Sequence, residues 1–260
     1  MLLAVDIGNT NIHVGLFRDG DALPTGHFCL GSDERRSADE YALLFSAMLE
    51  RRSASPDGID GVIVGSVVPT LTGTVRAAIA ALTDAPVTVV GPGVKTGFPI
   101  RLPDPAELGA DLAANTAGAI AAVGYPAVVV DFGTATVVSA VDRDRSFPGA
   151  SILPGVGMSL DALGETGLLK TVSGGGAIPT VGKGTEEAIR SGVLRGQIYA
   201  VTGLVETYLR ELRLPAETPV VVSGGYAEEL LPLLPRGYAH VPLLTLRGLA
   251  EIYRVNAKRR

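Results

Sequence analysis

A pattern of strand, turn and strand occurs twice in this chain of 260 residues, and it limits the possible folds more than any other feature. The two copies span residues 2–17 and 127–141. In each copy an apolar run ends at Asp-x-Gly and small polar residues follow, so that Asp6 corresponds to Asp131 and Gly8 to Gly133. Short apolar runs bounded by glycine and polar residues indicate buried strands joined by a tight turn. The repeat therefore predicts two similar domains, each presenting an acidic turn to a shared cleft.

The first turn has the composition of a phosphate-binding site. Gly8 lets the backbone approach an anion closely, and Asn9, Thr10 and Asn11 supply hydrogen-bond donors. A carboxylate beside a phosphate is repelled unless a cation lies between them, so Asp6 indicates Mg²⁺, bound directly or through water. Taken alone, the stretch also fits a hairpin whose Asp and Asn side chains only satisfy the geometry of the turn.

Composition and charge exclude several functional classes. The net charge of −5 argues against a nucleic-acid surface, which needs clustered Lys and Arg. The single cysteine, Cys29, cannot form an internal disulfide, and the three histidines are too scattered to suggest a His/Cys metal site. The apolar stretch 117–130 is interrupted by Gly118, Gly124 and Pro126, so no membrane span is predicted. We expect a cytoplasmic protein that binds neither nucleic acid nor membranes.

Strands and helices alternate in the first half of the chain. Strands are predicted at residues 28–30, 61–67 and 87–90, and helices at 37–52 and 71–82, the first of them capped by Ser37 with Glu40 three residues on. This alternation predicts an α/β fold, and the initial hairpin makes its sheet mixed. We expect duplicated actin-like, ribonuclease H-like domains with mixed sheets flanked by helices. The predicted domains are residues 1–116 and 117–260, with the last helix packing back on the first domain.

A carboxylate is predicted at the start of a helix near residue 111. Asp104 can cap a helix that begins at Pro105, or the helix can restart near Asp111 and run to Ala121. In the second case Asp111 lies in the first turn, where the helix dipole keeps it ionised. It is then either a plain N-terminal cap or a base that faces the cleft.

The second half contains a glycine-rich stretch at 172–176 and a long helix from 185 towards 209, with expected breaks at Gly192 and Gly196. Thr185 is predicted to cap that helix and can donate a hydrogen bond to a substrate. A strand at 219–223 ends in two glycines, where a nucleotide base is expected to lie, and residues 243–256 form a closing amphipathic helix.

Nine short motifs, taken together in this order and spacing, carry a family resemblance over nearly the whole chain. They are Asp6-Ile-Gly-Asn-Thr-Asn, Gly65-Ser-Val-Val-Pro, Gly91-Pro-Gly-Val-Lys-Thr-Gly, Leu108-Gly-Ala-Asp, Asp131-Phe-Gly-Thr-Ala-Thr, Ile152-Leu-Pro-Gly, Gly182-Lys-Gly-Thr, Ser223-Gly-Gly-Tyr and Leu246-Arg-Gly-Leu. The chain resembles the actin, hexokinase and sugar-kinase superfamily and, within it, the type III pantothenate kinases.

The resemblance implies ATP-dependent phosphorylation of pantothenate to 4'-phosphopantothenate, the first step of coenzyme A biosynthesis. It assigns Asp111 as the general base and Asp131 to a monovalent cation, K⁺ or NH₄⁺. Two further sets of residues follow from it. The ATP and Mg²⁺ set is Asp6, Ile7, Gly8, Asn9, Thr10, Asn11, Ile12, His13 and Thr134, and the pantothenate set is Gly109, Ala110, Asp111, Leu112 and Thr185. The resemblance also implies a homodimer with the substrate bound near the subunit interface.

Two positions depart from the family pattern. The family has Arg immediately after the catalytic Asp, where it would pair with the pantothenate carboxylate, and this chain has Leu112. A Tyr of the family is replaced by Leu102, and Arg101 is the neighbouring cation that can substitute. The alternatives are therefore a non-catalytic or regulatory protein of the same fold, and a kinase for another small alcohol.

Overall fold

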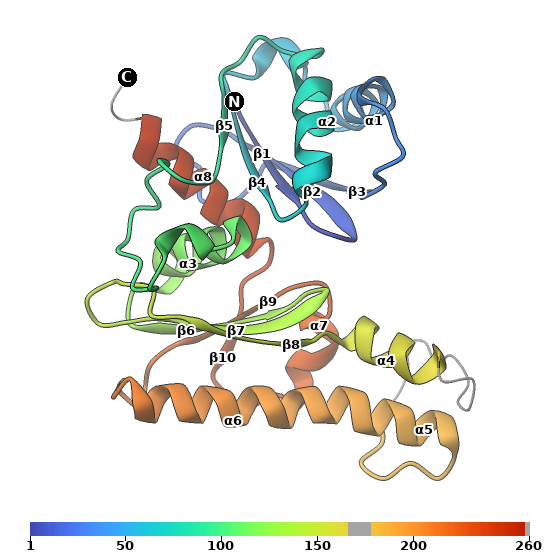
Figure 1. Ribbon diagram of the computed structural model, residues 1–260, viewed down its shortest axis with the longest axis vertical. Helices are drawn as coiled ribbons and strands as arrows, with labels where there is room; N and C mark the ends of the chain where they lie inside the picture. The colour runs from blue at the N-terminus through green and yellow to red at the C-terminus, as the bar shows by residue number, and fades with distance from the viewer. Residues whose placement is uncertain (166–177, 258–260) are drawn as a thin grey trace. The chain divides into compact units, whose positions relative to one another are not determined.

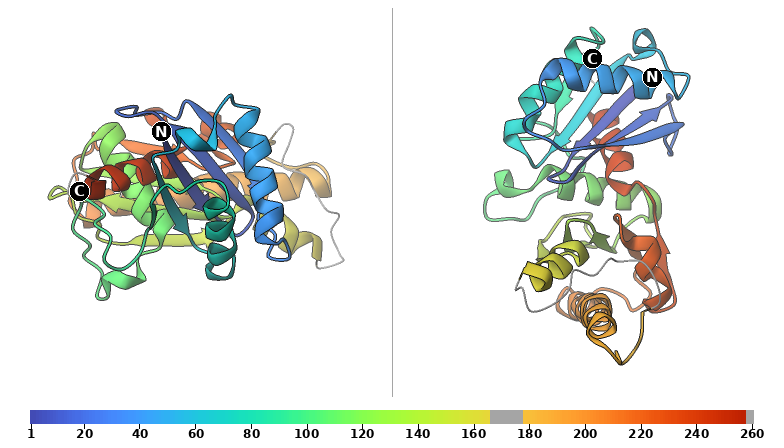
Figure 2. Two further views of the ribbon diagram at one scale, coloured as in Figure 1. Left: turned by 90° about the horizontal axis from the view of Figure 1, so that it is seen from above. Right: turned by 90° about the vertical axis from the view of Figure 1, so that its right-hand side faces the viewer.

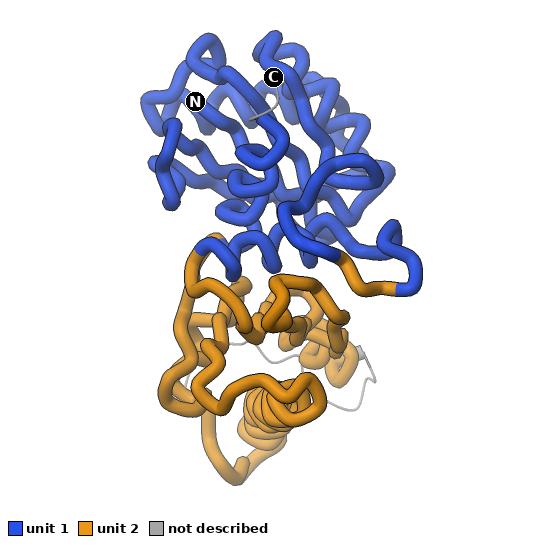
Figure 3. The backbone as a smooth tube through the Cα atoms, turned by 90° about the vertical axis from the view of Figure 1, so that its left-hand side faces the viewer, with its two compact units in different colours: residues 1–99, 103–121, 244–260 blue, residues 100–102, 122–243 orange. Residues whose placement is uncertain are grey.

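The computed structural model describes residues 1–165 and 178–257 (Figure 1). The chain divides into two compact units (Figure 3). Unit 1 comprises Met1–Pro99, Pro103–Ala121 and Leu244–Arg260, and unit 2 comprises Ile100–Leu102 and Ala122–Leu243. The division between the two units falls inside helix α3 (Ala110–Val123). The domain boundary expected after residue 116 falls inside the same helix. The last helix belongs to unit 1.

Unit 1 is built on a mixed five-stranded sheet with the order β3-β2-β1-β4-β5. Its strands are β1 (Leu2–Ile7), β2 (Asn11–Phe17), β3 (Gly26–Gly31), β4 (Gly61–Ser66) and β5 (Val87–Val89). β1 pairs antiparallel with β2 and parallel with β4, so that Asp6 has His13 on one side and Gly65 on the other. The predicted first hairpin and the strands near residues 28, 61 and 87 are confirmed.

Helices cover both faces of this sheet (Figures 1 and 2). α1 (Ala38–Glu50) and α2 (Pro69–Ala80) bury Tyr41, Phe45 and Val75 in a core with the apolar side chains of β1, β2 and β4. α8 (Leu244–Ala257) packs on the other face, against β1, β2 and β4. The capping box predicted for α1 is present, since Ser37 Oγ accepts from the Glu40 N–H and Glu40 in turn accepts from the Ser37 N–H. Both short helices, η1 (Pro56–Gly58) and η2 (Pro105–Glu107), are 3₁₀ turns.

Helices α3 and α8 meet at two glycines within unit 1. A Cβ atom at Gly248 would lie 1.7 Å from the carbonyl oxygen of Ala114, and one at Gly118 would lie 2.6 Å from that of Leu244. The Thr245 hydroxyl adds a hydrogen bond of 2.8 Å to the side chain of Asn115. Backbone therefore touches backbone, which holds α3 in a defined place relative to α8 and the sheet.

Unit 2 repeats the arrangement of unit 1. Its sheet has the order β10-β9-β6-β7-β8. Its strands are β6 (Ala127–Phe132), β7 (Ala135–Val141), β8 (Ala150–Pro154), β9 (Val220–Ser223) and β10 (Tyr238–His240). The order β8-β7-β6-β9-β10 corresponds to the order β3-β2-β1-β4-β5 of unit 1. In both sheets the first three strands pair antiparallel, and the last two run parallel to the third. The predicted duplicated fold with mixed sheets is confirmed.

Helices of unit 2 pack mainly through apolar residues of α6 (Gly196–Glu211), which contacts β6 and β7. The other helices are α4 (Val156–Glu165), α5 (Thr185–Arg190), α7 (Ala227–Leu230) and η4 (Leu231–Leu233). The expectation of breaks at Gly192 and Gly196 is wrong, because a π-helical segment, η3 (Ser191–Arg195), joins α5 to α6 with helical backbone at both Ser191 and Gly196. The prediction that Thr185 caps the helix is wrong, because Gly184 has the extended backbone of the cap and Thr185 is the first helical residue. The glycine-rich stretch at 172–176 lies outside the described residues.

Among the helices in the described ranges, none is long and apolar enough to cross a membrane.

Candidate active site

The first acidic turn lies at the end of β1. Asp6 is the penultimate residue of β1 and is half-buried, whereas Asn9, Thr10 and Asn11 are exposed. The Gly8 N–H donates to the Asn11 carbonyl at 3.0 Å, which closes the turn. Ile7 and Ile12 are fully buried and fix the two strands in the core. The turn therefore presents polar groups from a rigid base, as predicted from the sequence.

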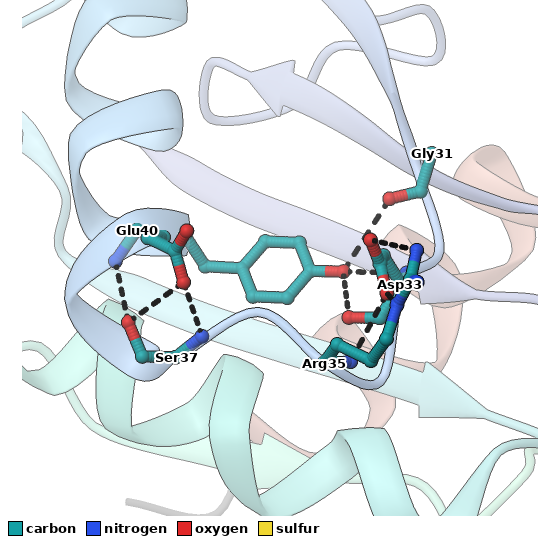
Figure 4. Close-up of polar contacts among 6 residues, drawn as sticks. Gly31, Asp33, Arg35, Ser37 and Glu40 are labelled. Carbon is teal, nitrogen blue, oxygen red and sulfur yellow. Dashed lines mark hydrogen bonds and ion pairs between the residues drawn. The ribbon is translucent and has the colours of Figure 1, made fainter.

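Ser32 holds this turn from the far side, and no local sequence pattern pointed to it. Its hydroxyl donates to the Gly8 carbonyl at 2.6 Å, and its N–H donates to the Thr10 carbonyl at 2.9 Å. Ser32 follows β3, and the segment around it is anchored by the Tyr41 hydroxyl (Figure 4). The turn is thus supported by residues more than twenty positions away in the chain.

His13 lies directly opposite Asp6 in the β1–β2 ladder. Burial is the main cause that lowers its pKa below 6.5, and the neighbouring His27 lowers it further. The two imidazole rings are stacked, with centroids 6.2 Å apart. A neutral imidazole is therefore favoured beside the Asp6 carboxylate at neutral pH.

Asp111 lies in the first turn of α3, so the second of the two predicted helix starts is correct. The run that begins at Pro105 is only the 3₁₀ turn η2, and α3 begins at Ala110. Asp111 Oδ1 accepts from the Leu112 N–H at 2.8 Å, and it lies where a Cβ on Gly109 would be only 2.5 Å away. The glycine thus leaves room for the carboxylate.

The start of α3 reaches the end of the sheet that carries the first turn. A Cβ built on Gly65 would lie 3.7 Å from the Ala110 side chain, and Gly65 is the β4 partner of Asp6. Gly109, Ala110, Asp111 and Leu112 therefore lie with residues 6–13 in unit 1, at the same end of one sheet. This places a carboxylate at a helix start near a polar glycine turn, which suits phosphoryl transfer.

The second acidic turn, in unit 2, is enclosed by two glycines. A Cβ on Gly224, whose φ is +98°, would lie 2.5 Å from Asp131 Oδ1, and one on Gly155 would lie 2.0 Å from the Thr134 carbonyl oxygen. The Tyr226 N–H donates to the Phe132 carbonyl at 3.1 Å, which joins the β9–α7 turn to the acidic turn. Only glycine fits at positions 155 and 224, which explains the first glycine of Ser223-Gly-Gly-Tyr and the glycine of Ile152-Leu-Pro-Gly.

Three residues that the sequence analysis related to the substrate are divided between the two units. Thr185, at the start of α5, belongs to unit 2, whereas Leu112 is half-buried on α3 in unit 1. Arg101, the cation considered in place of the family Arg, forms an ion pair with Asp144 within unit 2. Arg101 is therefore already engaged by a carboxylate.

The donor chemistry of the first turn suits a nucleotide and its cation. Mg²⁺ is typically held by one or two carboxylates together with phosphates and water, and Asp6 supplies one carboxylate. In the parts of the chain that the structure describes, no group of three or more His, Cys, Asp or Glu side chains is arranged to hold a metal ion.

Solved structures confirm the actin-like fold that the two repeated sheets define. Component A of the (R)-2-hydroxyglutaryl-CoA dehydratase from Acidaminococcus fermentans is 17% identical, with a TM-score of 0.60 over 100% of this chain and 99% of that one. A structure from Campylobacter jejuni described as a putative Baf family transcriptional activator is 18% identical, with a TM-score of 0.61 over 98% of this chain and 99% of that one. At these identities the likeness concerns the fold alone.

Sequence comparison identifies the family. The model of the type III pantothenate kinase family matches residues 2–207. A type III pantothenate kinase from Streptomyces coelicolor is 38% identical over the whole of both chains, and one from Acidothermus cellulolyticus is 39% identical over 98% of this chain and 99% of its own. The chain belongs to the type III pantothenate kinase family, and it is a kinase.

Proposed function

We propose that this chain transfers the γ-phosphoryl group of ATP to the primary hydroxyl of pantothenate, forming 4'-phosphopantothenate at the start of coenzyme A biosynthesis. The observation that carries the proposal is the placement of Asp111 and the Asp6 turn at the same end of one sheet, in a chain that belongs to this family. Phosphoryl transfer needs positioning and charge neutralisation more than covalent chemistry, and these residues provide both.

Residues 6–13, together with Thr134, are the proposed ATP-binding set. The exposed turn supplies N–H, hydroxyl and amide donors for phosphate oxygens, and its rigid base keeps them in place. Asp6 would hold Mg²⁺ through the phosphates or through water, and this ion would neutralise charge on the phosphates. Asp131 would serve a monovalent cation, K⁺ or NH₄⁺, beside the turn that Gly155 and Gly224 enclose.

Asp111 is the proposed general base. Its carboxylate accepts the proton of the pantothenate hydroxyl, the oxygen attacks the γ-phosphorus, and ADP leaves with the electron pair of the broken bond. The position in the first turn of α3 supports this role, because it brings the carboxylate to the end of the sheet that carries the proposed phosphate-binding turn.

Pantothenate is proposed to contact Gly109, Ala110, Leu112 and Thr185. Leu112 cannot pair with the substrate carboxylate as an arginine would, so this chain needs another donor for that group. We further propose a homodimer and a cytoplasmic location, both of which follow from the family.

The direct test is ATP-dependent phosphorylation of pantothenate by the purified protein with Mg²⁺, in K⁺ and in Na⁺. K⁺-dependent formation of phosphopantothenate would establish the reaction and the cation. ATP binding without any product would favour a non-catalytic protein of the same fold, and turnover of another alcohol but not pantothenate would favour a different kinase.

A further inference from the structure

Ser32 bonds to both carbonyl groups that flank Asn9 in the first turn. We propose that Ser32 is a positioning residue for ATP, which acts by orienting the peptide groups of the Gly8–Thr10 turn towards the phosphates. The inference rests on the proposed function only in that this turn receives a nucleotide. Ser32 itself lies behind the turn and is not assigned any contact with substrate.

The orientation follows from the planarity of the peptide group. In a trans peptide the C=O of one residue and the N–H of the next point in opposite directions. The Ser32 hydroxyl holds the Gly8 carbonyl at 2.6 Å, so the Asn9 N–H must point away from Ser32. The Ser32 N–H holds the Thr10 carbonyl at 2.9 Å, so the Asn11 N–H must likewise point away from Ser32. One residue thus sets the direction of the Gly8–Asn9 and Thr10–Asn11 peptide groups, which lie on either side of the Asn9–Thr10 peptide.

The same two bonds keep two carbonyl oxygens, which carry partial negative charge, away from the side of the turn that is proposed to face the phosphates. A carbonyl oxygen carries a partial negative charge and repels a phosphate, whereas N–H groups attract it. With both carbonyls directed at Ser32, the N–H groups of Asn9 and Asn11 point away from Ser32, and the carbonyls of Gly8 and Thr10 do not lie on the same side as these donors. Preorganised donors bind an anion more tightly because the binding free energy is not spent on orienting them.

The second acidic turn lacks this device. Asn11 pairs with Gly31 in unit 1, and the corresponding residue of the repeat, Thr136, pairs with Leu153 in unit 2. The residue after Gly31 is Ser32, and the residue after Leu153 is Pro154. Proline has neither an N–H nor a hydroxyl, so it can form neither bond. This support therefore belongs to the first turn and not to the second, and the first turn supplies every residue of the proposed ATP-binding set except Thr134.

The Tyr41 hydroxyl bonds to Gly31 and Asp33, the two neighbours of Ser32 in the chain (Figure 4). The Tyr41 side chain is 0% exposed, and its hydroxyl accepts from the Asp33 N–H at 2.9 Å and bonds to the Asp33 carbonyl at 3.1 Å. The ring is fixed by the core, and α1, which carries it, is fixed by the Ser37–Glu40 capping box. The connection between β3 and α1 is thus rigid on both sides of Ser32.

The test compares nucleotide binding by the Ser32→Ala, Ser32→Thr and unchanged proteins. Binding of a non-hydrolysable ATP analogue with Mg²⁺ is measured by calorimetry, and KM for ATP and for pantothenate is measured in the kinase assay. We expect Ser32→Ala to weaken analogue binding and raise KM for ATP by about three- to tenfold, the range that one net hydrogen bond spans. KM for pantothenate should not change, and Ser32→Thr, which keeps the hydroxyl, should restore most of the affinity.

Thr25 offers a matched control. Its hydroxyl and N–H both donate to the Leu16 carbonyl, at 3.2 and 2.7 Å, so it also uses these two donors, on a single carbonyl at the opposite end of β2. Thr25→Val removes that hydroxyl bond at a distance from the turn, and we expect nucleotide binding to stay unchanged.

The outcomes separate this inference from the proposed function. Unchanged analogue binding in Ser32→Ala overturns the positioning role, and so does an equal loss in Thr25→Val, which would show a general structural effect. A rise in both KM values together also overturns it. If the unchanged protein does not phosphorylate pantothenate, the proposed function fails, but the calorimetric comparison still decides the role of Ser32.

Discussion

Replacing Gly248 with alanine tests how closely α8 must approach α3. Two effects of known size oppose each other. Alanine is favoured over glycine in a helix interior by about 1 kcal/mol. A Cβ at this position, however, would lie 1.7 Å from the Ala114 carbonyl oxygen and 2.9 Å from the Gly118 N–H nitrogen. Ordinary contact begins at 3.4 Å, so the two backbones would have to separate by about 1.7 Å, the difference of the two distances.

We expect the packing effect to prevail. Both atoms belong to backbone, so no side-chain rotation can relieve the overlap, and overpacking of this kind costs about 1–3 kcal/mol or more. At the upper end of that range, a cost of about 3 kcal/mol less the gain of about 1 kcal/mol leaves a net loss of about 2 kcal/mol, which corresponds to a fall in Tm of roughly 4–8 °C in a chain of this size. Because α3 carries Asp111, kcat should fall as well, since a displacement of about 1 Å at a catalytic group can cost a hundredfold.

The assay is thermal unfolding followed by steady-state kinetics, with Gly73→Ala as the matched control. Gly73 lies in α2 of the same unit, and a Cβ there would meet nothing within 4 Å. That variant should be stabilised by about 1 kcal/mol through helix propensity alone. If Gly248→Ala raises Tm as Gly73→Ala does, the close contact between α3 and α8 is refuted.

Three further predictions concern the site and its surroundings. Asp111→Asn should abolish phosphorylation but leave ATP binding largely intact, because it removes the base and not the phosphate donors; near-normal turnover would exclude Asp111 as the base. Leu112→Arg should lower KM for pantothenate by about tenfold or more by supplying a guanidinium for the substrate carboxylate, and an unchanged KM would show that another group already fills that role. Burial and then Arg52 depress the pKa of His27 in the folded protein below 6.5. The unfolded chain therefore binds more protons below that pH, so stability should fall as pH falls through about 6.5, and less steeply in His27→Gln; equal slopes in denaturant titrations would contradict this.

Much of the fold follows from patterns that are local in the sequence. The paired Asp-x-Gly turns predict two repeats because each lies between apolar strand residues, and the Ser37–Glu40 spacing predicts where α1 begins. The sequence leaves two helix starts open, and the structure confirms the one that puts Asp111 in a first helical turn. In the structure Gly109 directly precedes α3, and its lack of a side chain leaves room for the Asp111 carboxylate.

Other features depend on contacts that no local pattern encodes. Ser32 and the turn it supports are separated by more than twenty residues, and only the β2–β3 register brings them together. The cap of α5 is not set by residue type alone, because Thr and Gly are about equally favoured as N-caps and the extended backbone of Gly184 takes that position here. The ion pair of Arg101 with Asp144 likewise joins segments about forty residues apart.

The position of α8 in unit 1 has a consequence for folding during synthesis on the ribosome. The first sheet emerges early, but the face that α8 covers stays open until Leu244 and the residues after it have been made. Between these events lie residues 122–243, and 243 − 121 gives 122 residues, which take about 6–24 s at roughly 5–20 residues per second. Unit 2 is a nearly continuous stretch and can complete its core during that delay, whereas unit 1 cannot. A chain that terminates anywhere before α8 would therefore present an uncovered apolar sheet to chaperones and proteases, so truncation would yield a degradation substrate and not a partly active enzyme.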